Sequence, residues 1–294
     1  MVRNDTVGSR IFDGFNAVFL ILFAIATTVP FIYIIAGSFA SQAEITARGF
    51  FLIPRQPRLE AYQYIMTSRL LPRSMIVSIV VTVVGTFVSM FVTVTFAYPL
   101  SKKYLPGRSV MLSMVVFTML FNGGMIPTFL TVRMFGLLNS FWAMILPGAV
   151  SVWNLIVLKN FFQGIPEELE DSARIDGASD FRVFVRIVLP LSTAAIATFS
   201  LFYAVGYWNS FRPALLYLPG NTSMWPLQLV LRNIVMMSAG VIADAAPFDP
   251  EAIQPPPDSI RNAVIVFATV PILLVYPFIQ KHFTKGVMIG AIKG

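Results

Sequence analysis

Six long stretches of the chain carry no charged side chain, and they constrain its fold more than any other feature. They cover residues 14–43, 74–101, 109–132, 134–158, 191–211 and 262–280. A helix needs about 20 mostly apolar residues to cross a bilayer, and each stretch is about that long or longer. The pattern lacks the alternating strands of about ten residues that would indicate a transmembrane barrel. We therefore expect an all-α polytopic membrane protein with six transmembrane helices.

A seventh charge-free stretch, 213–231, is interrupted too often to be a further span. Pro213, Pro226 and the run Pro219-Gly220-Asn221 would leave backbone groups that hydrocarbon cannot satisfy. We expect this stretch to complete the fifth span and continue as a loop. The composition agrees with a membrane protein, since 56% of the residues are hydrophobic and the mean hydropathy is +0.76.

Lysine and arginine decide the expected orientation across the membrane. Six spans put both termini on one side, and if that side is the cytoplasm, twelve of the 21 basic residues lie in inner segments, including every lysine. The short segment 102–108 holds Lys102, Lys103 and Arg108, and short loops weigh most in the positive-inside rule. We therefore expect both termini to be cytoplasmic.

Three polar stretches separate the spans, and the middle one is unusual. Residues 41–73 and 219–261 are then external loops, and residues 164–190 form a cytoplasmic loop. Only 12% of the chain is charged, yet this cytoplasmic loop holds six of the fourteen acidic residues. These are Glu167, Glu168, Glu170, Asp171, Asp176 and Asp180.

The sequence GIPEELEDSARIDGASDF predicts two short helices, which we call the acidic knob (residues 167–184). Pro166 suits the first helical position, and the acids after it favour the positive end of the helix dipole. Gly177 is placed to end this helix in a left-handed cap, and Ser179 or Asp180 can cap the next. A solvated connector between two spans is the alternative, although it would not need the apolar residues Leu169, Ala173, Ile175 and Ala178.

The stretch DSARIDGASDFRVFVRIVLPLS resembles a loop shared by the membrane subunits of bacterial binding-protein-dependent ABC importers. That loop has the form EAA, three residues, G, nine residues, I-x-L-P. Gly177, Ile187, Leu189 and Pro190 stand at the matching positions. The chain departs from the pattern at its start, where Asp171-Ser172-Ala173 replaces Glu-Ala-Ala, and aspartate has a shorter reach than glutamate.

Further segments resemble the sugar-importer branch of the same family over nearly the whole chain. They are FNGGMIPTFLTVRMFGLLNSFWAMILPG, YWNSFRPALLYL and the tail KHFTKGVMIGAIKG. They are similar to the smaller membrane subunit of the maltose importer, and more so to subunits importing uronate-containing oligosaccharides such as alginate. The resemblance implies a type I ABC importer permease fold, a single permease domain over residues 1–294 and a bacterial inner-membrane location.

The resemblance also implies partners and roles. We expect a second homologous permease subunit, two ATPase subunits that bind ATP and Mg, an extracytoplasmic sugar-binding protein and membrane lipid, and no nucleic acid. The chain has no phosphate-binding GxxxxGK[ST] sequence, so it binds no nucleotide or other cofactor by this expectation. The acidic knob becomes a coupling helix that docks on an ATPase subunit through Glu168, Asp171, Ala173, Asp176, Gly177, Ala178 and Phe181.

Polar residues inside the spans are candidates for a substrate path. Asn122, Asn154 and Asn209 are costly in hydrocarbon and should face another helix or a wet path. Tyr203 and Tyr207 lie one helical turn apart, and aromatic faces stack on sugar rings. Hydrogen bonding between helices is the favoured interpretation for each asparagine taken alone, and an interfacial belt explains the nearby Trp208 equally well.

No catalytic or metal-binding constellation is present in the sequence. The chain lacks cysteine, paired carboxylates and a Ser/His/Asp set, and nothing near His282 makes it a ligand or a base. We therefore expect a permease subunit and not an enzyme. An ion-coupled secondary carrier for a small solute is the alternative, although no span core offers the acidic residue that it would need.

The external loops hold arginines and no lysine under the expected orientation. Arg48, Arg55, Arg58, Arg69 and Arg73 gather in the first of them. A guanidinium matches a carboxylate in a bidentate manner, which favours an acidic, alginate-like oligosaccharide as substrate. The alternative is that these arginines pair with Glu44, Glu60, the binding protein's acids or lipid headgroups.

Overall fold

The computed structural model describes the backbone of residues 7–238 and 257–291, with side chains through Val275 and at Pro277. These residues form helices and no strand, as predicted. The chain divides into two compact units, Met1–Pro72 with Leu231–Val270 and Arg73–Val230 with Pro271–Gly294. The proline-rich part of the predicted 219–261 loop and the side chain of His282 lie outside the described residues.

Three helices in the described part of the chain are long and apolar enough to cross a membrane. They are α1 (Val7–Ser38), α4 (Leu70–Ser101) and the part of α14 (Asp258–Ala291) that ends at Val275. Three further stretches pass the same test only as pairs of helices joined by a sharp bend. Counting each pair as one span gives up to six, which is compatible with the predicted number.

The third predicted span is not one continuous helix, which corrects the expectation for residues 109–132. It consists of α5 (Arg108–Leu120) and α6 (Met125–Met134), bent by 118°. The side-chain oxygen of Asn122 accepts a hydrogen bond from the N–H of Gly124 at 2.8 Å, and Gly124 has a φ of +88°. The side-chain hydrogen bond to the backbone and the positive φ of the glycine are both incompatible with a continuous helix, so the chain turns here.

The fourth predicted span is also bent, and another bend lies at the start of the fifth. Two 3₁₀ turns, Phe141–Met144 and Leu146–Gly148, precede α7 (Val152–Gln163) at an angle of 56°. The Ser151 hydroxyl accepts a hydrogen bond from the N–H of Asn154 and so caps the start of α7. The segment Asp180–Leu191 meets α11 (Thr193–Trp208) at 79°.

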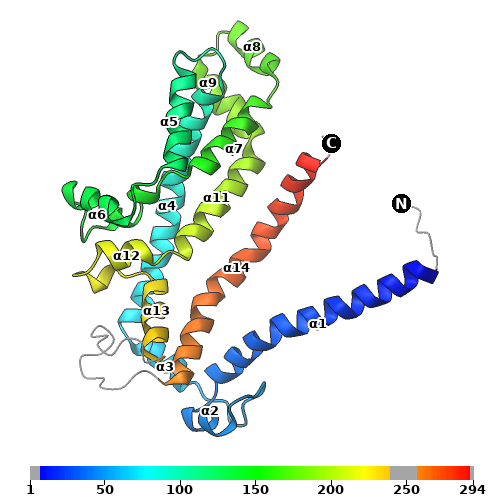
Figure 1. The fold of residues 1–294 in the computed structure, drawn as a ribbon, viewed down its shortest axis with the longest axis vertical. Helices are drawn as coiled ribbons and strands as arrows, with labels where there is room; N and C mark the ends of the chain where they lie inside the picture. Colours follow the sequence, from blue (N-terminus) through cyan, green and yellow to red (C-terminus); the bar gives the residue numbers. More distant parts are fainter. Residues whose placement is uncertain (1–6, 239–256, 292–294) are drawn as a thin grey trace. The chain divides into compact units, whose positions relative to one another are not determined.

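The core of the second unit joins four of its helices (Figure 1). Met90, Val94, Ala97 and Tyr98 of α4 pack with Leu158 and Phe162 of α7 and with Ala195, Phe199 and Tyr203 of α11. Val183, in the short helix α9 (Asp180–Val183), and Val188, in the π-helical turn Phe184–Val188, complete the same cluster. The acidic knob is therefore continuous with the core between the spans.

The stretch 41–73, predicted as a loop, contains two short helices of the first unit. These are α2 (Gln42–Arg48) and α3 (Glu60–Thr67). Ser41 caps α2 by accepting a hydrogen bond from the N–H of Glu44. In the stretch after the fifth span, α12 (Arg212–Tyr217) and α13 (Leu227–Ser238) form in place of an irregular loop.

Candidate functional site

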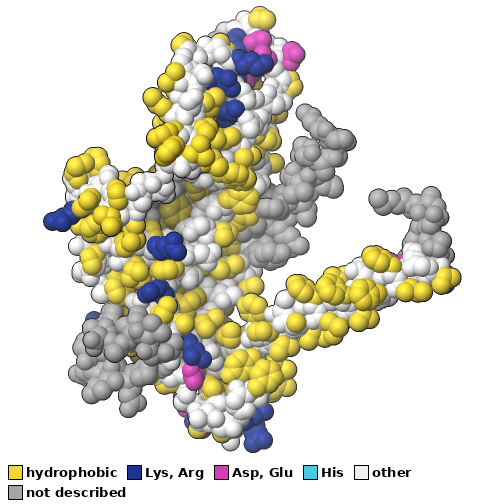
Figure 2. Space-filling model, viewed as in Figure 1, with side chains coloured by type: hydrophobic (Ala, Val, Ile, Leu, Met, Phe, Trp, Pro, Cys, Tyr) yellow, Lys and Arg dark blue, Asp and Glu magenta, His cyan; other side chains and the backbone are white. Residues whose placement is uncertain are grey.

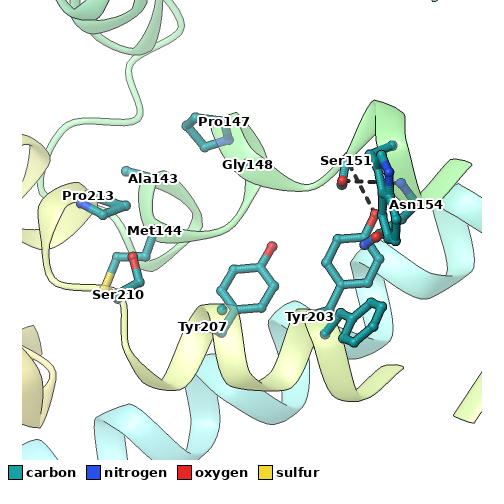
Figure 3. A pocket seen from close by; sticks show the side chains of 13 residues that line it. Ala143, Met144, Pro147, Gly148, Ser151, Asn154, Tyr203, Tyr207, Ser210 and Pro213 are labelled. Carbon is teal, nitrogen blue, oxygen red and sulfur yellow. Dashed lines mark hydrogen bonds between the residues drawn. The ribbon is translucent and has the colours of Figure 1, made fainter. Parts of the chain in front are cut away.

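A cavity of about 490 Å³ in the second unit brings three of the predicted path residues together (Figure 3). Asn154 enters it from the first turn of α7, and Tyr203 and Tyr207 enter it from α11. The remaining lining residues are Ala143, Met144, Pro147, Gly148, Ser151, Trp153, Phe202, Gly206, Ser210 and Pro213. This volume is typical of small-molecule sites.

The two tyrosines are fixed by hydrogen bonds that join three elements. The Tyr203 hydroxyl lies 2.7 Å from the hydroxyl of Thr93 on α4 and accepts from the N–H of Ser151 at 3.0 Å. The Tyr207 hydroxyl lies 2.8 Å from the hydroxyl of Ser89, also on α4. Because these bonds satisfy the buried hydroxyls, the tyrosines hold the cavity wall in one arrangement.

Gly85 on α4 makes room for one of these tyrosines. A Cβ atom at this position would lie 2.8 Å from two carbons of the Tyr207 ring, which is closer than real contacts allow. Small residues allow helices of membrane proteins to approach each other closely, and Gly85 serves α4 and α11 in this way.

Aromatic rings form one side of the cavity. Trp153 lies 6.0 Å from Phe202 and 6.2 Å from Phe199, measured between ring centroids, and it is about half exposed. The lining also includes the polar side chains of Asn154, Ser151 and Ser210. Apolar faces beside a few polar groups are what a sugar ring requires, because its faces carry C–H groups and its rim carries hydroxyls.

Asn122 and Asn209, the other two asparagines predicted for a substrate path, do not line this cavity. Asn122 is exposed at the break between α5 and α6, where it makes the turn described above. The Asn209 amide donates to the carbonyl of Val205 in its own helix at 2.9 Å, and it lines a separate groove beside Trp208. Asn122 lies at the bend between α5 and α6, whereas the sequence predicted one continuous span through this residue.

Four lining residues were not among the predicted path residues, namely Ser151, Trp153, Phe202 and Ser210. The signal for Ser151 and Trp153 lies in Pro147-Gly148, a helix-breaking pair that places α7's first turn in the cavity wall. Helical spacing alone does not place the other two in the wall, because Phe202 directly precedes Tyr203 in α11 and Ser210 lies beyond the end of that helix.

The acidic knob has the capped geometry that its sequence predicts. Two hydrogen bonds close the end of α8 (Glu167–Ile175). The N–H of Gly177 donates to the carbonyl of Arg174 at 3.0 Å, and the N–H of Ala178 donates to the carbonyl of Ala173 at 2.9 Å. Gly177 has a φ of +80°, so the helix ends in a Schellman motif. Ser179 caps α9, as predicted, whereas Pro166 is the cap residue of α8 and not its first helical residue.

The knob presents both apolar and acidic side chains to its surroundings. Ile175 is 87% exposed, Phe181 75% and Leu169 45%. Glu168, Asp171 and Asp176 are exposed as well, whereas Ala173 and Ala178 pack against the core below. Figure 2 shows the acids gathered with basic side chains at the end of this unit that carries α8.

One acid of the knob, Glu170, is buried, although its sequence position predicted only a place at the positive end of the helix dipole. Its carboxylate forms an ion pair with Lys102, the residue directly after α4, and lies 3.5 Å from the guanidinium of Arg174. The available signal was helical spacing, because Glu170 lies one turn before the half-buried Ala173 on the same face of α8.

Two proteins of Bacillus subtilis (strain 168) are similar to the chain over almost its full length. Protein LplC is 52% identical over 99% of this chain and 98% of its own. The polygalacturonan/rhamnogalacturonan transport system permease protein YtcP is 52% identical over 97% of this chain and 99% of its own. The chain belongs to the permease subunits of ABC sugar transporters.

Solved structures agree with this assignment. A chain of a bacterial ABC transporter involved in import of the acidic polysaccharide alginate matches the permease with a TM-score of 0.86 and 33% identity, over 95% of this chain and 98% of the other. A chain of an alginate transporter in complex with a periplasmic protein bound to alginate pentasaccharide shares the fold at 15% identity and a TM-score of 0.59. No protein-family model matches the sequence. The permease is an integral membrane transport subunit and not an enzyme.

Proposed function

We propose that the permease forms half of the translocation path of an importer for acidic oligosaccharides in a bacterial inner membrane. The observation that carries this proposal is its 52% identity to a polygalacturonan/rhamnogalacturonan permease, since polygalacturonan is an acidic polysaccharide. The similarity to the alginate transporter points to the same substrate class. The full assembly would contain a second permease subunit, two ATPase subunits that hold ATP and Mg, and an extracytoplasmic sugar-binding protein.

The acidic knob is the proposed contact with an ATPase subunit. Ile175, Phe181 and Leu169 expose apolar surface on an element that would otherwise be polar, which is typical of a protein–protein contact. The acids Glu168, Asp171 and Asp176 are exposed on the same element and would set orientation through charge. This docking requires the knob to lie in the cytoplasm, so both termini are proposed to be cytoplasmic.

The cavity beside Tyr203 is the proposed sugar site of this subunit. Trp153 and Phe202 would stack on a ring, and Asn154 and Ser151 would bind its hydroxyls. Arg212 lies between two lining residues, Ser210 and Pro213, and its side chain is exposed. It has no ion pair within the described part of the chain, so its charge is available to a carboxylate.

The arginines predicted to attract acids in the 41–73 stretch are partly committed to other partners. Arg48 pairs with Glu44 at 2.6 Å and Arg58 with Glu60 at 3.0 Å, as the alternative interpretation expected. The pKa of Glu44 is lowered, first by the N–H of Arg55 and then by the Arg48 guanidinium. Glu44 therefore stays ionised, and attraction of an acidic sugar would fall mainly to other arginines, Arg212 among them.

We expect the assembled importer to prefer an acidic oligosaccharide over a neutral one of equal length. The preference should shrink as salt rises from about 50 to about 200 mM, because screening weakens exposed charge interactions. The Arg212→Gln variant should lose part of the preference, and Arg58→Gln, which removes an arginine already paired with Glu60, should not. Uptake of labelled oligosaccharides into proteoliposomes measures this. A preference for the neutral sugar that salt does not change would contradict the acidic substrate and leave the family assignment intact.

A further inference from the structure

Glu170 is the exception among the acids of the knob. The other five are exposed, whereas the Glu170 side chain is 3% exposed. Both of its carboxylate oxygens accept hydrogen bonds from the Lys102 ammonium, which is itself 13% exposed. Arg174 and the Tyr98 hydroxyl, each 3.5 Å away, complete its surroundings. Such a buried pair depends on both partners, because removing either one leaves the other as an uncompensated buried charge.

The pair joins the knob to the end of a transmembrane helix. Lys102 follows Ser101, the last residue of α4, and its ammonium also lies 4.7 Å from the centre of the Tyr98 ring. The same helix end is held by Arg108, which donates to the carbonyl of Leu100, and by Gln163, which donates to that of Ser101. Displacement of α8 would therefore move the C-terminal end of α4 through the ion pair, because Lys102 directly follows that helix.

The same helix, α4, also contacts the residues of the proposed sugar site. Thr93 and Ser89 of α4 hydrogen bond to Tyr203 and Tyr207. Thr93 lies eight residues before Ser101, the last residue of α4, or about 12 Å along the helix at 1.5 Å per residue. α4 contains Pro99 between these residues but stays helical through it, so a shift at Lys102 would be passed along α4 to the cavity tyrosines.

We propose that Glu170 and Lys102 form a positioning link that passes movement of the coupling helix along α4 to the cavity. This inference rests on the proposed function, because it assumes that an ATPase subunit moves the knob. The competing route runs through the apolar contacts of Ala173 and Ala178 with the core. The two routes predict different results when the ion pair is removed and the alanines are kept. If the ion pair is the link, ATP hydrolysis no longer drives uptake, and if the alanine contacts are the link, it still does.

The chain contains a matched control pair beside the proposed link. Lys103 and Glu167 come from the same two segments, but their charges are 3.9 Å apart and both side chains are more than three-quarters exposed. Exposed pairs of this kind contribute little. The test compares Glu170→Gln, Lys102→Met and the double variant with Glu167→Gln and Lys103→Met. Each is assembled with its ATPase, partner permease and binding protein in proteoliposomes.

The measured quantity is sugar taken up per ATP hydrolysed, which poor folding or assembly alone would not change. We expect Glu170→Gln and Lys102→Met each to lower it by about ten-fold or more, since breaking a buried pair is costly. The double variant should fall no further than either single variant, because both act through one interaction. The control variants should match the unmodified complex.

An unchanged ratio in Glu170→Gln, or losses that multiply in the double variant, would overturn the link. These outcomes leave the proposed function standing as long as the unmodified complex shows binding-protein-dependent, ATP-driven uptake. Failure of the unmodified complex in the same assay would count against the proposed function itself.

Discussion

Replacing Gly177 by valine is expected to leave the permease inserted and the ATPase active but to stop sugar uptake. The φ of +80° at this residue belongs to the left-handed region, which costs a residue with a Cβ atom about 1–2 kcal/mol and is least tolerated by β-branched side chains. A Cβ atom here would meet no neighbour within 4 Å, so the penalty lies in the backbone and not in crowding. Relief of this strain would undo the Schellman cap and change the direction of α9.

Two controls separate this effect from a general loss of stability. Gly177→Asn should retain most uptake, because asparagine tolerates the left-handed region. Gly49→Val likewise places a β-branched residue at a positive φ, +65°, in open space, on the 41–73 stretch of the other unit. It should leave the ratio of uptake to hydrolysis unchanged. Normal uptake by Gly177→Val, measured alongside ATP hydrolysis in proteoliposomes, would refute a coupling role for the knob.

Replacing Gly85 by valine is expected to disable the cavity while sparing the knob. Its Cβ atom would lie 2.8 Å from the Tyr207 ring, so the ring must move and its hydrogen bond to Ser89 is lost. Overpacking of this kind costs about 1–3 kcal/mol. We expect uptake to fall by about ten-fold, as a free-energy change near 1.4 kcal/mol implies, while basal ATP hydrolysis of the assembled complex persists.

Gly14→Val provides the matched control for Gly85→Val. Gly14 also lies within a long apolar helix, and no atom stands within 4 Å of a Cβ atom placed there. Uptake should be close to that of the unmodified protein. If Gly85→Val transports normally, with Tyr207 displaced or not, the cavity has no part in transport by this subunit.

Much of the fold could be predicted because membrane crossing leaves a strong signal. A charge-free run of about 20 residues has few alternatives, so the apolar stretches and the helical class follow directly from the sequence. The bends did not follow as easily. The break after α5 depends on Asn122 and Gly124, and the one before α7 follows Pro147-Gly148, all short polar or breaking signals inside apolar runs.

Those features of the candidate site that depend on neighbouring residues in the sequence could be predicted. The left-handed cap at Gly177 and the Ser179 cap depend on neighbouring residues and were confirmed. The place of Asn209 and the burial of Glu170 depend on which helix packs against which, and no local pattern specifies this. Asn154, Tyr203 and Tyr207 meet in one cavity because α7 and α11 contact each other, which only the tertiary structure reveals.

The central claim is that this chain moves sugar only as the membrane subunit of an ATP-driven assembly. The most direct measurement is uptake of an acidic oligosaccharide into proteoliposomes that contain the purified chain alone or the complete complex. We predict no saturable uptake and no ATP hydrolysis by the chain alone. The complex should show uptake that requires ATP, the ATPase subunits, the partner permease and the binding protein. Saturable uptake by the chain alone, driven by an ion gradient, would contradict the claim and favour a secondary carrier.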